Sequence, residues 1–286
     1  MAEPAAGTLA IVAGGGEIPA LAIEACERAG RPYFVFALEG HADHPAVFAA
    51  RHEVIRIGAA GRFVKRAREE GVGDVVMVGR VRRPALRQIR PDARAAAFVA
   101  RFAVKSLGDD GLLRAVAAEL ERFGFRVVGI QDIVAGLLAP AGTLSRTGPD
   151  EQAQRDIARG LEIARSLGNL DVGQAVVVQQ SLVLGVEAIE GTDALLERCA
   201  GFRRDGPGGV LVKIRKSRQD RRIDLPTVGA ATVENAAAAG LRGIAVEAGG
   251  TILVNRDAVV AAADKAGLFL VGLTPDGDEA DAERIA

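Results

Sequence analysis

The sequence is poor in aromatic residues, cysteine and histidine. It has no Trp, one Tyr and 4% aromatic residues overall, so the aromatic platforms that stack single-stranded nucleic acid are not expected. The two cysteines, Cys26 and Cys199, lie far apart and form neither a disulfide framework nor a CxxC motif. Each follows a helical pattern beside apolar residues, which predicts buried thiols. With three histidines in the whole chain, a zinc site of His and Cys ligands is not expected.

Targeting and membrane-spanning segments are also missing. Residues 1–7 contain neither a basic n-region nor an apolar h-region, and a secretory signal peptide needs both. The sequence contains no run of about 18 apolar residues that could cross a bilayer as a helix. These absences predict a cytoplasmic protein.

The remaining composition is that of an ordinary globular protein. The chain has 286 residues, of which 49% are hydrophobic and 26% charged, so a disordered chain is excluded. This length favours two domains of moderate size. Lys and Arg number 36 against 37 Asp and Glu, and nucleic acid is not an expected partner.

Two segments depart from this balance of charge. Residues 80–105 carry many arginines and the single acid Asp92, and residues 203–222 form a second basic cluster. Such clusters suit a phosphate-bearing ligand or an anionic membrane surface. A solvated arginine-rich face would explain them equally well.

In the first half of the chain, short apolar runs alternate with helical patterns. Strands are predicted at Thr8–Ala13, Tyr33–Leu38, Val54–Ile57, Asp74–Val78 and Phe125–Ile130, and helices at Ile18–Ala29, Gly61–Glu70, Ala93–Leu107 and Leu112–Phe123. Pro19 suits the first turn of the first helix, and Gly30 suits its end. The alternation predicts a doubly wound, Rossmann-like parallel sheet in residues 1–130.

The second half follows a different pattern. Residues 131–150 are predicted to be a linker, residues 151–275 a mixed α/β domain, and residues 276–286 a flexible tail. The domain is predicted to contain helices at Asp150–Leu167, Thr192–Cys199, Thr232–Ala239 and Arg256–Ala266, with Asp150 and Thr192 as N-caps. Its predicted strands are Gln174–Gln179, Leu182–Ala188, Val210–Ile214, Gly243–Glu247 and Leu268–Gly272. The first two strands are expected to pair around Gln180-Ser181, and Thr251–Leu253 is expected to form a hairpin with Gly243–Glu247. The predicted fold class is therefore α/β in both domains.

A glycine-rich turn separates the first predicted strand from the first helix. Gly14, Gly15 and Gly16 can bring the backbone close to a ligand and point N–H groups at an anion. Pro19 stands where the dinucleotide fingerprint has its third glycine, and no P-loop lysine follows. The turn predicts nucleotide or phosphate binding, with a tight structural turn as the alternative. Glu17 could cap the helix or bind a sugar hydroxyl.

A second candidate is Gly79-Arg80, directly after a predicted strand. Ligands of open α/β sheets bind beyond the carboxyl ends of the strands. Gly79 would allow close approach, and Arg80 could hold a phosphate with two hydrogen bonds or lie in solvent. The helix predicted next combines an apolar face with basic residues, which suits acyl chains or packing against the sheet.

Acidic and basic side chains gather in two segments of the second half. Residues 187–193 (EAIEGTD) and 219–227 (QDRRIDLPT) flank the basic strand 210–216 (VLVKIRK). Phosphoryl transfer requires carboxylates that hold a hard cation such as Mg²⁺, beside cations that neutralise phosphate oxygens. Asp224 precedes a rigid Leu-Pro step that would fix its carboxylate. A surface network of salt bridges would account for the same composition.

Together these segments resemble a known family. AGGGEIP, DVVMVGRVRRP, GQAVVVQQSLVLGVEAIEGTDALL and GGVLVKIRKSRQDRRIDLPTVG are similar to sequences of the Mg²⁺-dependent UDP-2,3-diacylglucosamine pyrophosphatases of lipid A biosynthesis, the LpxI type. The resemblance covers residues 8–273, and its most specific parts are EGTDALL and KxxQDxRxDLPT. The sequence departs from the family pattern at Ser181, where glycine is usual.

The resemblance implies a hydrolase that splits UDP-2,3-diacylglucosamine into UMP and 2,3-diacylglucosamine 1-phosphate (lipid X) at the cytoplasmic membrane face. It also implies Mg²⁺ as cofactor and attack of water on the β-phosphorus. Asp224 is the expected catalytic residue, and the expected metal ligands are Glu190, Asp193, Asp220 and Asp224. The expected substrate contacts are Gly14, Gly15, Glu17, Gly79, Arg80, Gly191, Thr192, Lys213, Arg222 and Thr227.

Two other function classes fit parts of the sequence. A non-catalytic sensor would bind a UDP-sugar without hydrolysing it. An NAD-dependent oxidoreductase would use the first domain, although the third glycine of the fingerprint is missing. For a glycolipid substrate, transient membrane contact is expected at residues 80–105, and a homodimer is expected from base rates alone.

Overall fold

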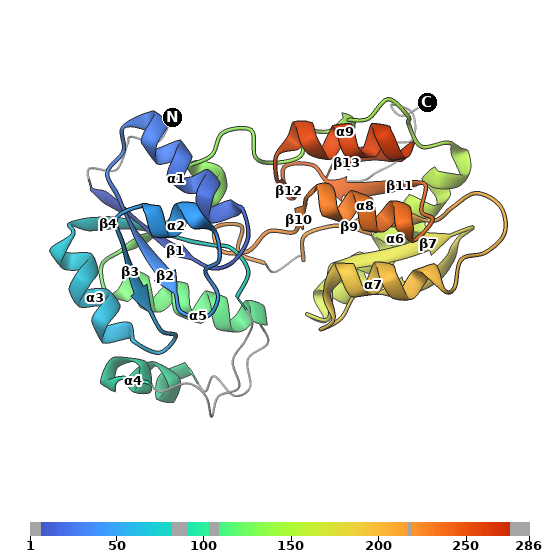
Figure 1. The fold of residues 1–286 in the computed structure, drawn as a ribbon. Helices are drawn as coiled ribbons and strands as arrows, with labels where there is room; N and C mark the ends of the chain where they lie inside the picture. The colour runs from blue at the N-terminus through green and yellow to red at the C-terminus, as the bar shows by residue number, and fades with distance from the viewer. Residues whose placement is uncertain (1–6, 82–90, 103–108, 217–218, 275–286) are drawn as a thin grey trace. The chain divides into compact units, whose positions relative to one another are not determined.

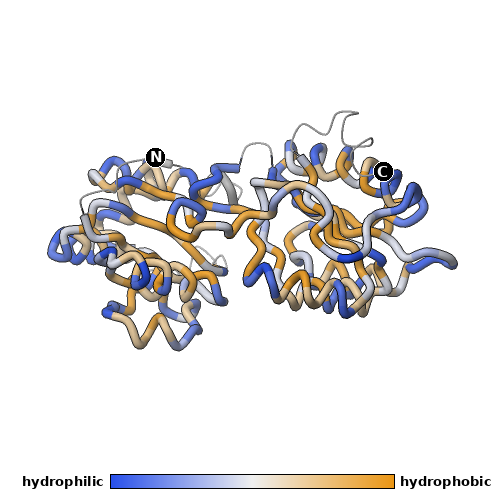
Figure 2. Tube along the Cα trace, turned by 90° about the horizontal axis from the view of Figure 1, so that it is seen from above, coloured by the Kyte–Doolittle hydropathy of each residue, from blue (hydrophilic) through white to orange (hydrophobic). Residues whose placement is uncertain are grey.

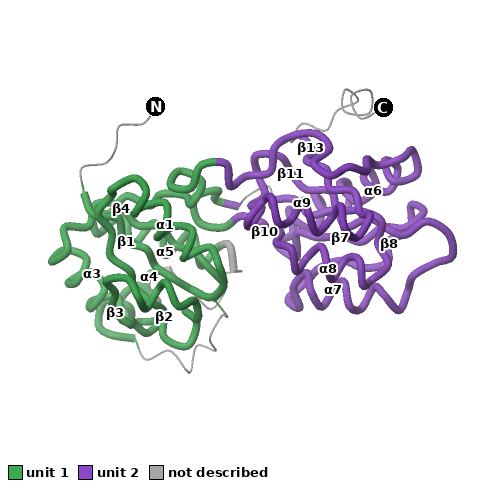
Figure 3. The backbone as a smooth tube through the Cα atoms, turned by 45° about the horizontal axis from the view of Figure 1, so that its top comes forward, with its two compact units in different colours: residues 1–135, 220–224 green, residues 136–219, 225–286 purple. Residues whose placement is uncertain are grey.

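Contacts divide the chain into two compact units. The computed structural model describes residues 7–81, 91–102, 109–216 and 219–274. Unit 1 comprises residues 1–135 and 220–224, and unit 2 comprises residues 136–219 and 225–286 (Figure 3). The division at 135/136 falls inside the predicted linker. Residues 220–224 were expected in the second domain, but their contacts are with unit 1.

Unit 1 is a five-stranded parallel sheet with the order β3-β2-β1-β4-β5 (Figure 1). The strands are β1 (Thr8–Ala13), β2 (Tyr33–Leu38), β3 (His52–Ile55), β4 (Val72–Val78) and β5 (Arg126–Val127). The helices are α1 (Ile18–Ala29), α2 (Pro45–Ala49), α3 (Ala60–Glu69), α4 (Ala93–Phe102) and α5 (Asp109–Arg122), followed by the 3₁₀ turn η3 (Ile130–Asp132). Because the winding direction reverses between β1 and β4, the predicted doubly wound sheet is confirmed.

In unit 1 the predicted helix boundaries agree best with the structure where a proline or a glycine marks the end of a helix. Pro19 lies in the first turn of α1, and Gly30 ends that helix with a left-handed φ of 61°. The strand predicted over 125–130 is only β5, because the chain turns into η3 directly afterwards. Helix α2 was not predicted. The end of the helix predicted over 93–107 lies outside the described residues.

A small aromatic cluster fills the core of unit 1. Phe34, Phe36, Phe63 and Phe125 are all buried, and the centroids of successive rings lie 4.5–5.8 Å apart. These edge-on and tilted contacts add to the burial energy of the rings. Four of the ten phenylalanines of the sequence thus pack the sheet against α3.

Unit 2 is a six-stranded mixed sheet with the order β6-β13-β11-β9-β7-β8. Its strands are β6 (Gly142–Thr143), β7 (Ala175–Gln179), β8 (Leu182–Val186), β9 (Val210–Lys213), β11 (Gly243–Glu247) and β13 (Phe269–Leu273). Strands β9, β11 and β13 are parallel to one another, whereas β7 is antiparallel to both β8 and β9. The mixed α/β character predicted for this region is confirmed.

Helices cover both faces of this sheet. Helix α6 (Glu151–Asn169) packs on one face, and α7 (Gly191–Ala200), α8 (Ala230–Ala238) and α9 (Arg256–Ala266) pack on the other. Figure 2 shows the apolar strands inside each unit. Asp150 caps α6 as predicted, since its Oδ1 accepts the Ala153 N–H at 2.9 Å. Cys26 and Cys199 are buried as predicted, and burial raises the pKa of both thiols. Among the helices that the structure describes, none is both long and apolar enough to span a bilayer.

The β7–β8 hairpin confirms the predicted turn. Gln180 and Ser181 have φ values of 53° and 62°, so Ser181 adopts the left-handed conformation that glycine would take without strain. The buried Asp156 carboxylate accepts the N–H groups of Gln180 at 3.1 Å and Ser181 at 2.6 Å. These two bonds hold the turn in place of a glycine.

The second predicted hairpin is wrong. Residues 252–253 form β12, which pairs in parallel with β10 (Thr227–Val228) in a separate two-stranded sheet. Both edges of β11 are already occupied, by β9 on one side and β13 on the other. A hairpin partner therefore has no edge of β11 to join.

Candidate active site

In unit 1 the loops after β1 and β4 are hydrogen-bonded to each other. Gly15 N–H donates to the Arg80 carbonyl at 2.9 Å, and Arg80 N–H donates to the Gly15 carbonyl at 2.8 Å. A Cβ on Gly14 would lie 2.6 Å from the Arg80 carbonyl oxygen, so a side chain is excluded there. Gly79 has a φ of 91°, and a Cβ on Gly79 would likewise clash with the Gly14 backbone. These glycines let two loops meet at the carboxyl ends of neighbouring strands.

The N–H groups of the glycine turn are used within the chain. Gly14 donates to the Val78 carbonyl at 2.7 Å, Gly15 donates to Arg80, and Gly16 donates to Asp43 Oδ1 at 2.8 Å. The structure therefore favours a tight structural turn over a phosphate cradle built from these three groups. Glu17 makes no cap for α1, contrary to expectation, and it is exposed.

Arg80 is the one expected phosphate ligand that projects from these loops. It is exposed, and its guanidinium lies beside the turn, since a Cβ on Gly16 would be 3.7 Å from Arg80 Nε. Asp43, which the sequence analysis missed, lies against the same glycines. Its position on the loop after β2 could be found only once the order of the strands was known.

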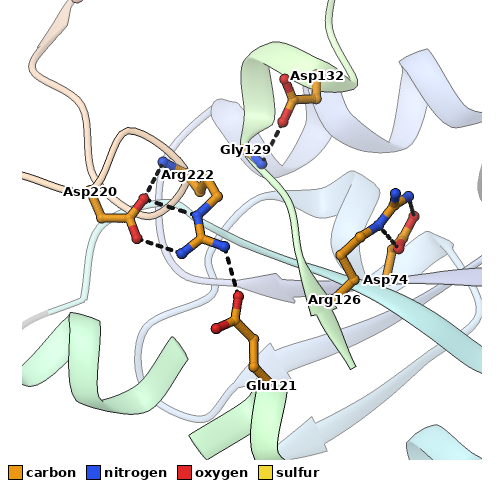
Figure 4. A network of polar contacts seen from close by, with 7 residues as sticks. All are labelled: Asp74, Glu121, Arg126, Gly129, Asp132, Asp220 and Arg222. Carbon is orange, nitrogen blue, oxygen red and sulfur yellow. Dashed lines mark hydrogen bonds and ion pairs between the residues drawn. The ribbon is translucent and has the colours of Figure 1, made fainter. Parts of the chain in front are cut away.

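Residues 220–224 form a turn that Arg222 ties to α5 (Figure 4). Arg222 donates to both oxygens of Asp220, at 3.1 and 2.7 Å, and to Glu121 Oε1 at 2.7 Å. These bonds raise the pKa of Arg222, and the bond from Arg222 lowers the pKa of Asp220. Asp224 is half-buried, and its N–H donates to the Asp220 carbonyl at 3.2 Å. Asp220 and Arg222, expected at metal and substrate, are here paired with each other.

In unit 2 a buried lysine ends strand β9. Lys213 is 6% exposed, and its Nζ donates to Thr192 Oγ1 and to the Thr227 carbonyl, both at 2.9 Å. Thr192 Oγ1 in turn donates to Glu187 Oε1 at 2.6 Å. The structure thus brings three expected substrate contacts together: Lys213, Thr192 and Thr227. Thr192 is not the predicted N-cap, because it lies inside α7 and its hydroxyl is used in this chain of bonds.

The other expected residues of unit 2 surround the start of α7. Gly191 is its first residue, with a φ of 82°. Glu190 accepts from Arg198 at 2.7 Å and from the Ala188 N–H at 3.1 Å. Hydrogen bonds from backbone N–H groups and from Arg198 lower the pKa of Glu190. Asp193 accepts from Asn235 at 3.0 Å.

The expected metal ligands do not form a preassembled cluster. Within the described residues, no group of three or more His, Cys, Asp or Glu side chains is placed to hold a metal ion. Glu190 and Asp193 belong to unit 2, whereas Asp220 and Asp224 belong to unit 1. Three of these four carboxylates have nitrogen donors as their partners. Each unit by itself therefore supplies two of the four expected magnesium ligands.

Two buried carboxylates at the same sheet edge were not assigned a role from sequence. Glu187 follows β8 and is 6% exposed, and Glu247 ends β11 and is 8% exposed. Glu247 accepts the Arg215 N–H at 2.9 Å. The available signal was an acidic residue at the end of an apolar strand, since acids rarely become buried without a partner.

Known proteins match both units. The family model of the LpxI N-terminal domain matches residues 8–137, and that of the LpxI C-terminal domain matches residues 140–271. The UDP-2,3-diacylglucosamine pyrophosphatase LpxI of Caulobacter vibrioides is 41% identical over 274 residues, which cover 93% of this chain and 98% of that protein. Two matches that together span most of the chain and a relative this similar confirm the resemblance seen in the sequence. The chain belongs to the LpxI family.

Proposed function

We propose that this protein hydrolyses the pyrophosphate bond of UDP-2,3-diacylglucosamine, as part of lipid A biosynthesis. The Caulobacter relative, similar over nearly its whole length, is named for this activity. The observation within the chain that carries the proposal is Lys213, an ammonium group buried at the carboxyl end of β9. A buried ammonium group at the carboxyl end of a parallel strand, where the ligands of α/β sheets bind, suits a substrate that carries a diphosphate.

The proposed reaction is a displacement at phosphorus. The oxygen of a water molecule forms a bond to the β-phosphorus, and the bond between that phosphorus and the bridging oxygen breaks. UMP leaves with the bridging oxygen, and 2,3-diacylglucosamine 1-phosphate keeps the oxygen of the water. Asp224 accepts the proton from the attacking water, and Lys213 stabilises the charge that develops on the phosphate oxygens.

The substrate contacts follow from the two sheet edges. Arg80 is proposed to bind a phosphate oxygen, and Glu17 a sugar hydroxyl. Gly14, Gly15 and Gly79 shape the loops that present them. In unit 2, Gly191, Thr192 and Thr227 complete the Lys213 edge. In unit 1, Arg222 is proposed to bind the substrate as well as to hold the turn that carries Asp224.

We further propose that turnover needs Mg²⁺. Because the described residues gather no cluster of three ligands, such an ion would be held by one or two carboxylates together with the phosphates of the substrate, as is usual for Mg²⁺. Of residues 80–105, where membrane contact is expected, residues 82–90 and 103–105 lie outside the described residues. That contact and the homodimer stay predictions.

The test is release of UMP from UDP-2,3-diacylglucosamine in mixed micelles, with Mg²⁺ and with excess EDTA, in water labelled with ¹⁸O. Release that EDTA stops, with the label in 2,3-diacylglucosamine 1-phosphate, supports the hydrolysis, the need for Mg²⁺ and attack on the β-phosphorus. Label in UMP would overturn attack on the β-phosphorus. Tight binding of a UDP-sugar without release would favour the sensor instead.

Asp224→Asn tests the catalytic assignment. The substitution removes the proton acceptor, so turnover is expected to fall at least about 100-fold, in the range that general bases contribute. Binding of substrate, measured by calorimetry, is expected to change little because the group acts in the transition state. Asp205→Asn, at an exposed position of unit 2, is the matched control. Turnover near that of the wild type would remove Asp224 from the mechanism.

A further inference from the structure

Glu187 lies one hydroxyl away from the lysine of the proposed site. Its Oε1 accepts from Thr192 Oγ1 at 2.6 Å, and that oxygen accepts from Lys213 Nζ at 2.9 Å. Glu187 and Lys213 are each 6% exposed. Two side chains of segment 187–193 and the lysine of β9 therefore form one row, in which the half-buried Thr192 stands between two buried charged groups.

The direction of each bond in this row is forced by chemistry. A lysine ammonium can only donate hydrogen bonds, and an ionised carboxylate can only accept them. The Thr192 hydroxyl has a single proton. Since its oxygen accepts from Lys213, its proton is directed to Glu187. The carboxylate thereby determines which way the hydroxyl lone pairs face.

Glu187 is itself held in place from the opposite side. Its Oε2 accepts the Gln174 N–H at 3.1 Å, and its own N–H donates to the Ala175 carbonyl at 2.8 Å. Close packing adds to these bonds, because a Cβ on Gly173 would lie 2.0 Å from the Glu187 carbonyl oxygen. The carboxylate is thus fixed to the start of β7, which lies between β9 and β8 in the sheet.

The ammonium group lies beside the start of α7. Thr192 lies in the first turn of α7, where the helix dipole favours anions. Glu190 at the N-cap makes no side-chain cap there. The helix dipole and the ammonium group both favour an anion there, whereas the nearby carboxylates of Glu187, Glu190 and Asp193 oppose one.

We propose that Glu187 is a positioning residue that acts through Thr192 to hold the Lys213 ammonium for the diphosphate of the substrate. This inference rests on the proposed function. It assigns to Glu187 a role in turnover, not only in folding, and it makes Thr192 the link between the carboxylate and the cation.

Four variants test the link: Glu187→Gln, Thr192→Val, Thr192→Ser and the double variant Glu187→Gln/Thr192→Val. Glutamine has one acceptor where Glu187 uses two, so either the Gln174 or the Thr192 bond is lost. Valine removes the hydroxyl and keeps the shape, whereas serine keeps the hydroxyl. Exposed positions supply the controls, Glu197→Gln on the same helix and Thr147→Val.

Each of Glu187→Gln and Thr192→Val is expected to lower kcat about 100-fold, the cost of misplacing a reacting group by about 1 Å. KM is expected to change less than kcat, and Thr192→Ser is expected to restore most of the turnover. The double variant is expected to be no worse than the poorer single variant, because both changes break one link. Multiplied losses in the double variant, or wild-type kcat in Thr192→Val, would overturn the inference.

Affinity for UDP, measured by calorimetry on the same variants, separates this inference from the proposed function. If the wild type releases no UMP, the proposed function fails. The inference then stands as anion binding only if Glu187→Gln and Thr192→Val weaken UDP binding without additivity. If neither variant changes UDP affinity in that case, both proposals fail. If Glu187→Gln does not fold, the contrast between Thr192→Val and Thr192→Ser decides the outcome.

Discussion

The two units bury charge at opposite ends of their sheets. In unit 1, Asp74 is 2% exposed near the start of β4, and it is bound by Arg31 and Arg126, which lie at the starts of β2 and β5. In unit 2, Lys213 lies at the end of β9, with Glu187 at the end of β8. Ligands of α/β sheets bind beyond the carboxyl ends of the strands, so only the second cluster is placed for function.

The contacts inside the two clusters differ as much as their positions. Arg126 donates to both oxygens of Asp74, at 2.8 and 2.9 Å, as Figure 4 shows. Arg31 donates to the same carboxylate at 2.5 Å. Burial alone would raise the pKa of Asp74, but the two arginines outweigh it and lower that pKa. In unit 2, Glu187 reaches Lys213 through a hydroxyl group. The arginines thus contact the Asp74 carboxylate directly, whereas the Thr192 hydroxyl links Glu187 to Lys213.

Lys213→Gln should show the largest difference in function between the Lys213 cluster and the Asp74 cluster. The amide keeps two N–H donors, but it has no charge and its side chain is one bond shorter. We expect kcat/KM for UMP release to fall roughly 1,000-fold, as when a donor to a developing anion is lost, or about 4 kcal/mol of barrier. Lys265→Gln, at an exposed position of α9, is the control. Unchanged kcat/KM would mean that the buried lysine only supports the fold.

Asp74→Asn should give the opposite result. It removes the charge that holds Arg31 and Arg126, so we expect the free energy of unfolding to fall by about 2 kcal/mol, the usual worth of hydrogen bonds to a charged group. Turnover at 25 °C should remain that of the wild type. Urea unfolding measures the first quantity, and Glu24→Gln, which removes an exposed ion pair with Arg28, is the control. A large loss of turnover would contradict the structural role.

The same variant predicts a pH dependence with a definite sign. Because the pKa of Asp74 is lower in the folded protein, its stabilisation is fully present above the unfolded pKa, about 3.9, and is lost as the pH falls below it. The difference in unfolding free energy between wild type and Asp74→Asn should therefore be constant from pH 7 to pH 5. It should shrink below pH 4. A difference that grows in acid would show that the carboxylate is not the stabilising species.

Local patterns made much of both units predictable. The alternation of strands and helices predicted the parallel sheet of unit 1, and Gly30 and Asp150 marked helix ends correctly, because capping depends on neighbouring residues alone. The Gln180-Ser181 turn was also found locally. Its support by Asp156 was not, since that residue lies more than twenty positions away and meets the turn only in the folded sheet.

The predictions that were wrong concern residues whose partners lie far away in the sequence. Residues 252–253 looked like a hairpin partner of the preceding strand, but strands distant in sequence already occupy both edges of β11. Thr192 looked like an N-cap, yet its hydroxyl is taken by Glu187 and Lys213. The glycines after β1 looked like a ligand cradle, yet they make room for the loop after β4. In each case the local sequence pattern was present, but a residue distant in the sequence determined which contact formed.

Variants of Arg222 and of its partner Glu121 are expected to have the smallest effects, and they separate a structural role from substrate binding. Its ion pairs with Asp220 and Glu121 are partly exposed, with 42% of its side chain accessible. We therefore expect both Arg222→Gln and Glu121→Gln to change the unfolding free energy by less than about 1 kcal/mol. Glu121→Gln only loosens the turn that carries Asp224. Arg222→Gln also removes a cation proposed to bind the substrate.

The two variants should thus differ in KM rather than in stability. If Arg222 binds the substrate, KM rises several-fold in Arg222→Gln and stays near the wild-type value in Glu121→Gln, where the guanidinium is still present. If Arg222 only ties residues 220–224 to α5, both variants lower kcat by the same small factor and leave KM alone. Steady-state kinetics on this pair therefore decides whether Arg222 has a structural role, as proposed for Asp74, or acts on the substrate, as proposed for Lys213.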